Sequence, residues 1–338
     1  MDIERRDELV AYLRDTGRIA VDETPEVRVL AGGVSNRTVL VKRGPGGAGG
    51  IGCGGEAWVL KQALAKLRTK ADWFSDPKRV HREALGLRWL EKLAPPGTIT
   101  PLVFEDHEHH LLAMQAVPEP HENWKTMLLA GGIEADHVEQ FAALLASIHR
   151  KSELVEELPQ LFDDRSFFES LRLEPYYAYA AEQVPAARDF LHQLIADTRA
   201  CRTALVHGDY SPKNVLVRDG RLILLDHEVI HWGDPAFDIG FALTHFLSKA
   251  HHLPENRERF AAAAMQFCDT YGNCNGAQRG QHTLGCLLAR VAGRSPLEYL
   301  DDAERRRQQR VVIDLMERSI DNVHDVIEQF VRGIDAHD

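Results

Sequence analysis

A short polar loop between two apolar runs constrains this chain more than any other feature of its sequence. The stretch LVHGDYSPKNVLV, residues 205–217, places Asp209 and Asn214 between segments whose composition is typical of buried strands. A second apolar run, RLILLDHE, then ends on Asp226 and Glu228. Residues two apart on an extended backbone point to the same side, so these two carboxylates could share one or two cations. Oxygen ligands of this kind suit Mg²⁺, which proteins commonly hold with carboxylates and substrate phosphates.

The order of the predicted elements indicates an α+β fold. Residues 26–44 predict a strand, a glycine-containing turn and a second strand, and residues 56–64 (EAWVLKQAL) predict a third strand that carries Lys61. Residues 100–117 are typical of two short strands around an acidic, histidine-rich turn. Helical patterns and the hairpin at the polar loop make up most of the remainder. A strand-rich first third followed by a helix-rich part is the arrangement of α+β proteins.

Helices and a boundary are predicted from local signals. In residues 75–94, Asp76 is expected to be an N-cap and Pro77 the first helical residue. A second helix is predicted by apolar spacing in residues 135–152. The proline-containing stretch PEPHENW breaks the pattern between them. We therefore expect an N-terminal nucleotide-binding lobe at 1–114, a hinge at 115–120 and a C-terminal catalytic and acceptor-binding lobe at 121–338.

Composition narrows the class of protein. The chain has 338 residues, long for one compact core, and its Lys plus Arg count of 40 against 51 Asp plus Glu gives a formal charge of −11. This balance argues against nucleic acid as a partner and is compatible with a cationic substrate, although a charge that serves solubility is the simpler interpretation. No segment approaches the roughly 20 apolar residues of a membrane span. We expect no membrane partner.

The cysteines and the first residues predict a compartment. The five cysteines are odd in number and form no C-x-x-C pair, which favours neither a disulfide framework nor a zinc site. A reducing cytosol fits this usage best. The start, MDIERRDELVAYLRD, is typical of an amphipathic helix and not of a signal peptide. A cytoplasmic location is therefore expected, while the oligomeric state stays open.

The polar loop matches the template of phosphoryl transfer. In kinases, H-x-D followed by four residues and Asn supplies a base and a metal ligand, and a later Asp after a strand supplies the main metal ligand. Here His207-Gly208-Asp209 stands in place of H-R-D, and Asp226-His227-Glu228 stands in place of D-F-G. The combination of both motifs with a glycine turn and a strand lysine is far more specific than either motif alone.

These residues resemble the aminoglycoside phosphotransferase and choline kinase family. HGDYSPKNVLV, LLDHE and GDPAFDIG are similar to its catalytic loop, metal segment and following turn, over roughly residues 28–247. VLKQALAKLR followed by REALGL, and the D-x-E segment, are most similar to the 5-methylthioribose kinase branch. The resemblance implies a bilobal protein-kinase-like fold with a small antiparallel-sheet N-lobe and a larger, mainly helical C-lobe.

The resemblance also implies ATP and Mg²⁺ as cofactors and assigns roles. Asp209 would be the catalytic base, Asn214 and Asp226 would hold Mg²⁺, and Glu228 would bind a second ion. Lys61 would contact the α- and β-phosphates. Glu83, on the predicted helix, would pair with Lys61. Lys42 is a rival for the role of Lys61, but it ends the second strand, whereas the phosphate-binding lysine is expected on the third.

Further residues are assigned by position alone. The turn AGGVSNR, with Gly32, Gly33, Ser35 and Asn36, would cover the phosphates through backbone N–H groups, although it lacks the full G-x-G-x-x-G pattern. The other positional candidates are Gln115 and Val117, whose backbone groups would pair with adenine at the hinge, and Trp232, which would wall the acceptor pocket.

Several polar residues are given structural roles. His207 is expected to brace the loop by hydrogen bonds, and Asp238 to cap or anchor it. His107, His109 and His110 resemble a metal-binding tract, but a solvated hairpin tip is the preferred interpretation.

The leading functional hypothesis is a kinase that phosphorylates a hydroxyl of a small polar metabolite, with a methylthioribose-type sugar as first choice. An aminoglycoside or amino-alcohol phosphotransferase is the alternative within the class. A catalytically silent nucleotide-binding regulator is a third hypothesis, disfavoured because the full residue set has no purpose without turnover. A protein kinase is disfavoured because no A-P-E segment follows the metal motif.

Overall fold

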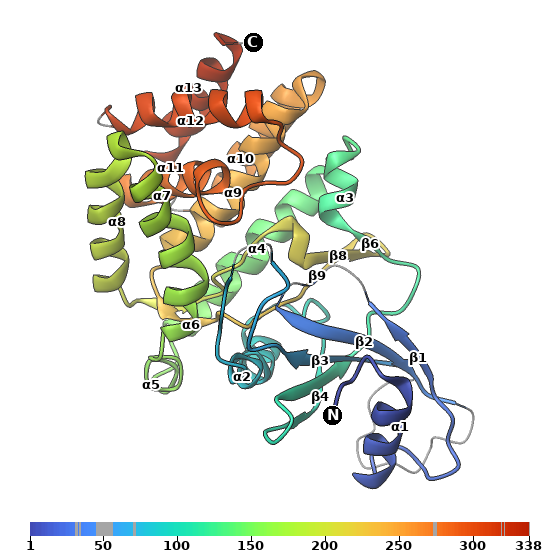
Figure 1. Cartoon of the computed structure of the whole chain (residues 1–338). Coiled ribbons are helices and arrows are strands. Elements are labelled where there is room, and N and C mark those ends of the chain that lie inside the picture. The colour runs from blue at the N-terminus through green and yellow to red at the C-terminus, as the bar shows by residue number, and fades with distance from the viewer. Residues whose placement is uncertain are drawn as a thin grey trace. The chain divides into compact units, whose positions relative to one another are not determined.

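The computed structural model describes residues 1–30, 33, 35–44, 57–69, 72–272, 276–318, 320 and 322–337. The chain forms two compact units, each described here by itself (Figure 1). The first unit comprises Met1–Lys92, Ile99–His121 and Asp226–Glu228, and the second comprises Leu93–Thr98, Glu122–Leu225 and Val229–Asp338. The division is therefore not a single cut along the chain, because residues 226–228 return to the first unit. The hinge at 115–120 stays a prediction.

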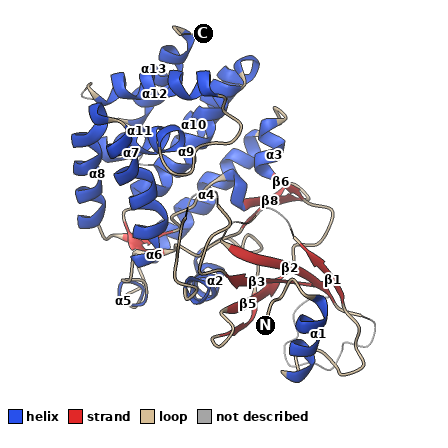
Figure 2. Cartoon of the chain, viewed as in Figure 1, coloured by secondary structure: helices blue, strands red, loops and turns tan. Residues whose placement is uncertain are grey.

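An antiparallel sheet organises the first unit, and Figure 2 shows its strands in red. The strand order is β1-β2-β3-β5-β4, and neighbouring strands are antiparallel. The strands confirm those predicted from apolar runs. Their bounds are β1 Glu26–Val29, β2 Asn36–Lys42, β3 Ala57–Ala63, β4 Leu102–Asp106 and β5 Leu111–Gln115.

The two faces of this sheet have different partners. Side chains alternate along β3, so Trp58 and Leu60 lie on one face, where they join a buried core with Leu9 and Leu13 of α1 (Arg6–Asp15). Lys61 lies on the other face and meets α2 (Arg79–Leu93). The alternation of β3 thus separates a hydrophobic core from a polar site.

The predicted helix 75–94 is present but begins later than expected. Asp76 accepts a bond from the backbone N–H of Lys78 (2.9 Å) and its carbonyl accepts one from Arg79. These bonds close a turn at Pro77 and Lys78, and α2 starts at Arg79. The predicted position of the N-cap was therefore wrong, because Asp76 caps the turn that precedes the helix.

A nearly all-buried helix forms the centre of the second unit. Almost every residue of α9 (Pro235–His252) is buried, as expected for a helix surrounded by protein. It contacts α10 and α11, which in turn contact α4 and α12 (Figure 1). The predicted helix at 135–152 is confirmed. The α-helices of this unit are α3 Trp124–Leu129, α4 Ala135–Ser152, α5 Leu158–Leu161, α6 Ser166–Phe168, α7 Tyr179–Gln183, α8 Arg188–Ala200, α9, α10 Arg257–Tyr271, α11 Ala277–Ala292, α12 Asp302–Met316 and α13 Val323–Asp335.

Short strands and non-α helical turns complete the second unit. The predicted hairpin is formed by β8 and β9, and its turn uses Asp219 and Gly220, both with positive φ. The strands are β6 Glu122–Asn123, β7 Ala204–Val206, β8 Val215–Arg218, β9 Arg221–Leu224 and β10 His231–Gly233. The other helical turns are η1 Glu169–Ala178, a π-helix, and the 3₁₀ turns η2 Pro185–Ala187, η3 Pro212–Asn214 and η4 Pro254–Asn256.

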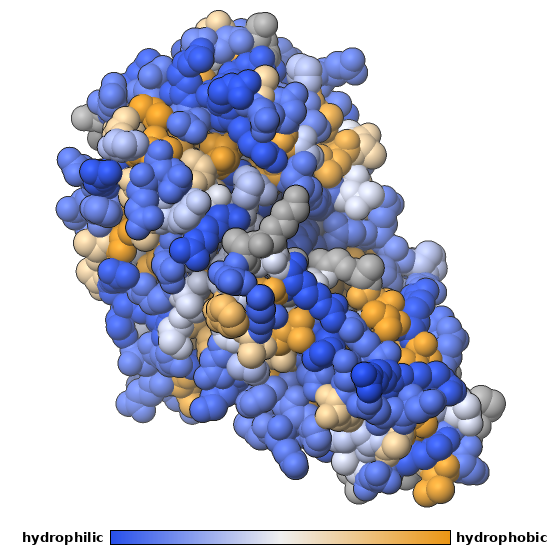
Figure 3. Space-filling view, in the orientation of Figure 1, coloured by the Kyte–Doolittle hydropathy of each residue, from blue (hydrophilic) through white to orange (hydrophobic). Residues whose placement is uncertain are grey.

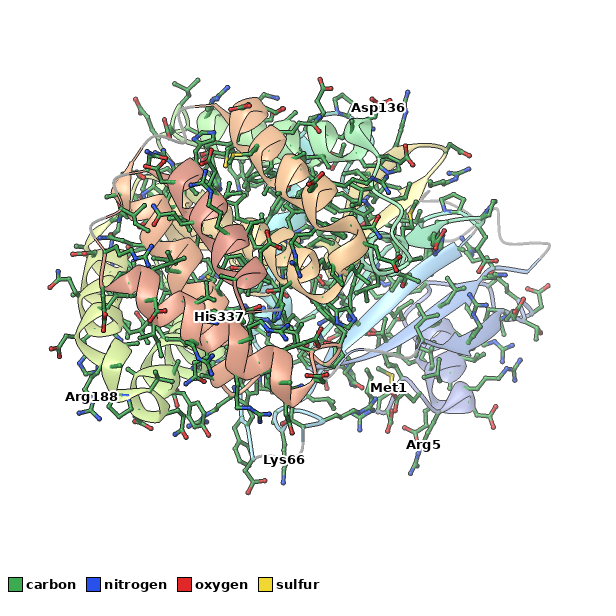
Figure 4. The ribbon with its side chains drawn as sticks, turned by 90° about the horizontal axis from the view of Figure 1, so that it is seen from above. Met1, Arg5, Lys66, Asp136, Arg188 and His337 are labelled. Carbon is green, nitrogen blue, oxygen red and sulfur yellow. The ribbon has the colours of Figure 1, made fainter. Side chains whose placement is uncertain are left out.

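One face of the molecule is mainly polar. Figure 3 shows a face on which hydrophilic residues predominate and apolar residues form small groups. Charged side chains such as Lys66 and Arg188 project outward from the ribbon (Figure 4). Among the residues that the structure describes, no helix combines the length and apolar character needed to cross a membrane.

Candidate functional site

Lys61 is the centre of a polar cluster in the first unit. Its Nζ donates to Glu83 Oε1 (2.7 Å) and to Asp226 Oδ1 (2.8 Å). Strand β3 supplies the lysine, α2 supplies Glu83, and the segment after β9 supplies Asp226. The structure thus brings together three residues that lie far apart in the sequence and were predicted to act together.

The charges of this cluster depend on one another. Burial acts to lower the pKa of Lys61, but the nearby carboxylates of Asp226, Glu83 and Glu228 outweigh it and raise the pKa above its ordinary value. Lys61 is therefore a permanent cation. Burial raises the pKa of Glu83 to about 7, with Lys61 opposing that shift and Asp226 adding to it.

Asp226 has an unusual backbone. Its φ of 67° lies in the left-handed region, which non-glycine residues seldom adopt. The backbone N–H of the next residue, His227, contacts Glu83 Oε1 at 3.4 Å. Such backbone conformations persist where surrounding contacts hold them, and they are frequent at functional sites.

Glu228 is held by two buried partners that the sequence did not reveal. Its Oε2 accepts from Arg79 Nε (3.1 Å) and from Asn36 Nδ2 (3.0 Å). Arg79 is fully buried and also donates to backbone carbonyls, including those of Ser35 and Leu64. A buried guanidinium needs such saturation of its donors. Arg79 therefore connects the predicted phosphate turn to the predicted metal segment.

The donor set of this cluster fits a hard cation. The carboxyl groups of Glu83, Asp226 and Glu228 face the cations Lys61 and Arg79, so the potential metal ligands of the cluster are all oxygen atoms. Among the described residues, Glu83 Oε2 is buried without a hydrogen-bond partner, and so is Asn36 Oδ1. Carboxylate and amide oxygens are ligands that Mg²⁺ accepts.

The second unit carries Asp209 and Asn214 on the loop after β7. Asn214 Nδ2 donates to the Asp209 carboxylate (2.7 Å) and to the Asp209 backbone oxygen (3.0 Å). With its nitrogen turned toward Asp209, the carboxamide of Asn214 has its oxygen as the atom that could bind a cation. The 3₁₀ turn η3 sets this spacing, since Asn214 ends it.

Arg172 is a site residue that sequence reasoning missed. Its guanidinium lies 2.9 Å from Asp209 Oδ2 and donates to the backbone oxygen of Gly208 (2.9 Å). Arg172 belongs to η1, where Pro175 lies inside the π-helix. Insertions of π-helical geometry are frequent at functional sites. Pro175 within a helical pattern was the one sequence signal for an irregular helix here, but it does not indicate that Arg172 contacts Asp209.

Asp238 anchors the loop, as predicted. Its carboxylate accepts from the backbone N–H groups of His207 (2.7 Å) and Gly208 (2.8 Å) and contacts His149 Nε2 at 3.2 Å. Burial acts to raise the pKa of Asp238, yet hydrogen bonding and the charge of His149 hold it below its ordinary value. The predicted bracing role of His207 is also confirmed, since its Nδ1 accepts from the backbone N–H of Asp209 (3.2 Å).

The remaining predicted residues have the following places. Gly32 lies outside the described residues, while Gly33 is described and exposed. Lys42, the rival of Lys61, is 41% exposed and lies 3.9 Å from Glu119. The backbone N–H of Gln115 donates to the backbone oxygen of Pro101, and Val117 is buried. Trp232 is also buried, and its Nε1 donates to the backbone oxygen of Arg202 (3.0 Å).

Comparison with known proteins gives a consistent picture. A model of the phosphotransferase enzyme family matches residues 26–277. A methylthioribose kinase of Pectobacterium atrosepticum is 26% identical over 272 residues, which cover 69% of this chain and 66% of that kinase, just under two thirds of its length.

Solved structures share the fold. An amicoumacin kinase in complex with AMP-PNP, Ca²⁺ and Ami aligns with a TM-score of 0.58 at 14% identity, covering 93% of this chain and 95% of that one. A choline/ethanolamine kinase family protein from Mesorhizobium loti aligns with a TM-score of 0.52 at 15% identity, covering 98% and 99%. These likenesses confirm the predicted kinase-like α+β fold.

Proposed function

Because the chain belongs to the phosphotransferase enzyme family, we propose that it is an ATP- and Mg²⁺-dependent small-molecule kinase that phosphorylates a hydroxyl of a sugar-like metabolite. The observation that carries this proposal is the loop in which Asp209 is held by Asn214 and Arg172 at hydrogen-bonding distance. A carboxylate fixed in this way is suited to orient an acceptor hydroxyl and take its proton.

The proposed mechanism rests on positioning and charge. Asp209 aligns the acceptor oxygen and accepts its proton as the new P–O bond forms. Lys61, oriented by Glu83, binds the α- and β-phosphates through its permanent positive charge. Both tasks need side chains that are ordered before the substrate binds. The ion pair with Glu83 orders Lys61, and the ion pair with Arg172 orders Asp209.

Magnesium would be held by oxygen atoms of Asn214, Asp226 and Glu228. Bound Mg²⁺ neutralises charge on the β- and γ-phosphates. Asp226 accepts from Lys61 through Oδ1, and Glu228 accepts from Arg79 and Asn36 through Oε2, so both carboxylates are held in place within the cluster. The oxygen ligands of these residues support this assignment, because Mg²⁺ prefers oxygen.

The nucleotide contacts beyond Lys61 follow from position. The turn with Gly32, Gly33, Ser35 and Asn36 is proposed to cover the phosphates, and the backbone groups of Gln115 and Val117 to pair with adenine. The contacts of Ser35 and Asn36 give this turn a second task. The Ser35 carbonyl accepts from Arg79 and the Asn36 amide donates to Glu228, so the turn also holds the metal segment.

The charges near Asp209 favour a neutral or anionic acceptor. The guanidinium carbons of Arg172 and Arg290 lie 5.6 and 5.5 Å from the ring centre of Tyr176, and Arg290 also donates to the Tyr176 hydroxyl (3.1 Å). Arg290 adds a guanidinium close to the Arg172–Asp209 ion pair, which disfavours a polycationic aminoglycoside. A methylthioribose-type sugar is uncharged, and the methylthioribose kinase relative supports the same choice.

An acceptor panel tests the proposal. ADP formation should be measured with Mg-ATP and methylthioribose, other pentoses, amino sugars, aminoglycosides and choline, with transfer confirmed by phosphorus NMR of the acceptor. We expect kcat/KM for a methylthioribose-type sugar to exceed that for any aminoglycoside at least about a hundredfold. A preference for aminoglycosides would replace the first choice by the alternative. ATP binding without turnover on every acceptor would favour the silent regulator.

The proposed pocket wall is tested by the kinetics of the Trp232→Phe variant with the preferred acceptor.

A further inference from the structure

A second group of chemistry-bearing side chains lies in the first unit, outside the phosphoryl-transfer set. We define the hairpin cluster as His81 of α2, Glu105 of β4, and His107 and His110 in the turn between β4 and β5. The turn residues were expected to form a solvated hairpin tip, and the His107 side chain is indeed 71% exposed. The sequence did not predict that His81, about 25 residues earlier in the chain and on α2, contacts His107 and His110 of this turn.

The geometry of the cluster is that of a small ligand set. One ligand atom each from His81, Glu105 and His107 lies within 4.8 Å of the other two. His107 Nε2 is 3.0 Å from Glu105 Oε1, and the rings of His81 and His107 are stacked with centroids 3.9 Å apart. His110 Nδ1 lies 3.3 Å from His81 Nε2. Ligands about 2 Å from a common ion lie roughly 3 to 4 Å apart, so the contact between Glu105 and His107 fits an ion. The rings of His81 and His107 are nearly parallel, with an interplanar angle of 9°, and an imidazole binds a metal in the plane of its ring, so one of the two rings must rotate when an ion binds.

Two buried atoms of the cluster lack a partner. Within the described part of the chain, His81 Nδ1 and Glu105 Oε2 are both buried without a hydrogen bond. A buried polar atom without a partner costs free energy, and native proteins rarely retain one unless water, an ion or a ligand satisfies it. Both atoms are therefore candidates for ligands of an ion.

The ligand types select the class of ion. Imidazole nitrogens with one carboxylate suit Zn²⁺ and its first-row neighbours, whereas Mg²⁺ prefers oxygen alone. One contact opposes binding, since Arg88 Nη2 lies 3.2 Å from Glu105 Oε1 and would share that oxygen with an ion. We propose that His81, Glu105 and His107 form a binding site for a divalent first-row transition metal such as Zn²⁺.

An ion at this site would tie the β4–β5 hairpin to α2. His81 is two residues before Glu83 on the same helix, and Arg79 is two residues before His81. Occupancy would therefore restrain the helix that orients Lys61 and holds Glu228. The binding site itself does not depend on the proposed kinase activity, because none of its ligands belongs to the phosphoryl-transfer set.

Metal titration of the full chain tests this proposal. Metal-stripped protein, with Mg²⁺ in excess to fill any oxygen site, should compete with a chromogenic chelator for one equivalent of Zn²⁺. We expect His81→Gln and His107→Gln each to weaken Zn²⁺ binding at least tenfold, and Zn²⁺ to raise the melting temperature of the parent protein but not of these two variants. His121→Gln is the matched control, since His121 is an exposed histidine of the same unit.

Two outcomes would overturn the proposal. Equal Zn²⁺ affinity of the parent, His107→Gln and His121→Gln proteins would show that any binding is adventitious. Co²⁺ provides the second readout, because a thiolate-to-cobalt charge-transfer band would place the ion on a cysteine instead of the hairpin cluster. His107→Gln keeps the test independent of folding, as its ring is mostly exposed.

Discussion

At the scale of single residues, the site is built from charges that hold one another. Asp209 is positioned by Arg172 and Asn214, and Lys61 is positioned by Glu83 and Asp226. Every one of these contacts is between groups with little exposure, where electrostatic interactions are stronger than in water. Removal of one partner should therefore disturb the orientation of the other more than it disturbs the fold.

Arg172→Met tests this view of Asp209. The variant removes the guanidinium that contacts both the Asp209 carboxylate and the Gly208 carbonyl, so the base loses its fixed orientation. We expect kcat to fall by about ten- to a hundredfold while Mg-ATP affinity stays within about threefold. Steady-state kinetics and ATP titration measure the two quantities. Arg199→Met, which removes an exposed ion pair with Glu169, is the control; an equal loss of kcat in both variants would contradict the assignment.

Prediction from sequence reached the charged motif residues but not their partners. Asp209, Asn214, Asp226 and Lys61 stand in short motifs whose spacing is set by local backbone geometry. Arg172 stands in no motif, because its role depends on a π-helix that only tertiary packing selects. The pairing of Glu228 with Arg79 was missed for the same reason, since about 150 residues separate them.

At the scale of elements, the second unit depends on close helix packing. Gly240 of α9 faces α11 so closely that a Cβ at this position would lie 2.6 Å from the backbone carbon of His282. Only glycine permits this approach. The adjacent Asp238 of α9 anchors the catalytic loop, so the packing of α9 and the position of Asp209 are linked through one helix.

Gly240→Ala gives a prediction whose sign is decisive. Helix propensity alone would stabilise the variant by up to about 1 kcal/mol, whereas overpacking against the α11 backbone should destabilise it by about 1–3 kcal/mol. We expect the second effect to win, because backbone atoms cannot move aside as a side chain can. Urea unfolding measures the difference. Ala262→Gly in α10 is the control, because it measures the effect of helix propensity at an exposed position. A Gly240→Ala variant as stable as the parent would contradict the tight contact.

Element prediction succeeded where periodicity was local. The strands of the sheet, the helix at 135–152 and the β8–β9 hairpin follow from alternation, apolar spacing and turn residues. The start of α2 was placed too early because capping signals fit a turn as well as a helix. The short pairing of β7 with β10 could not be foreseen, because such brief strands carry no periodicity.

At the scale of the whole molecule, the chain order does not match the division into units. Residues 93–98 belong to the second unit, and residues 226–228 belong to the first. A linear boundary drawn from proline content cannot represent such an interleaved arrangement. The interleaving matters for function, because the three residues that return carry the D-x-E carboxylates.

Global stability should depend on pH through a buried lysine. Lys249 of α9 is fully buried, and its Nζ donates to the His245 backbone oxygen (3.1 Å). Burial lowers the pKa of Lys249 to about 7, with Lys125 and Arg290 acting in the same direction and Glu298 opposing them. Its ordinary pKa in the unfolded chain is about 10.4. Between these values the unfolded chain binds the extra proton, so the free energy of unfolding rises with pH.

Lys249→Met should remove this dependence. Between pH 7 and 9 the parent is expected to gain up to about 1.4 kcal/mol per pH unit from this group, and the variant is not. The variant should therefore exceed the parent in stability most clearly at pH 7. Urea unfolding at several pH values measures both curves. Parallel curves would contradict the buried, neutral state of Lys249.

The central claim is that Asp209 is the base of a phosphoryl transfer. The most direct measurement compares Asp209→Asn with the parent in transfer of the γ-phosphate of ATP to the preferred acceptor. Asp219→Asn, an equivalent change in an exposed turn of the same unit, is the control. We predict that Asp209→Asn lowers kcat at least about a hundredfold and leaves Mg-ATP binding nearly unchanged, while the control retains full activity. Turnover at the parent rate by Asp209→Asn would contradict the account.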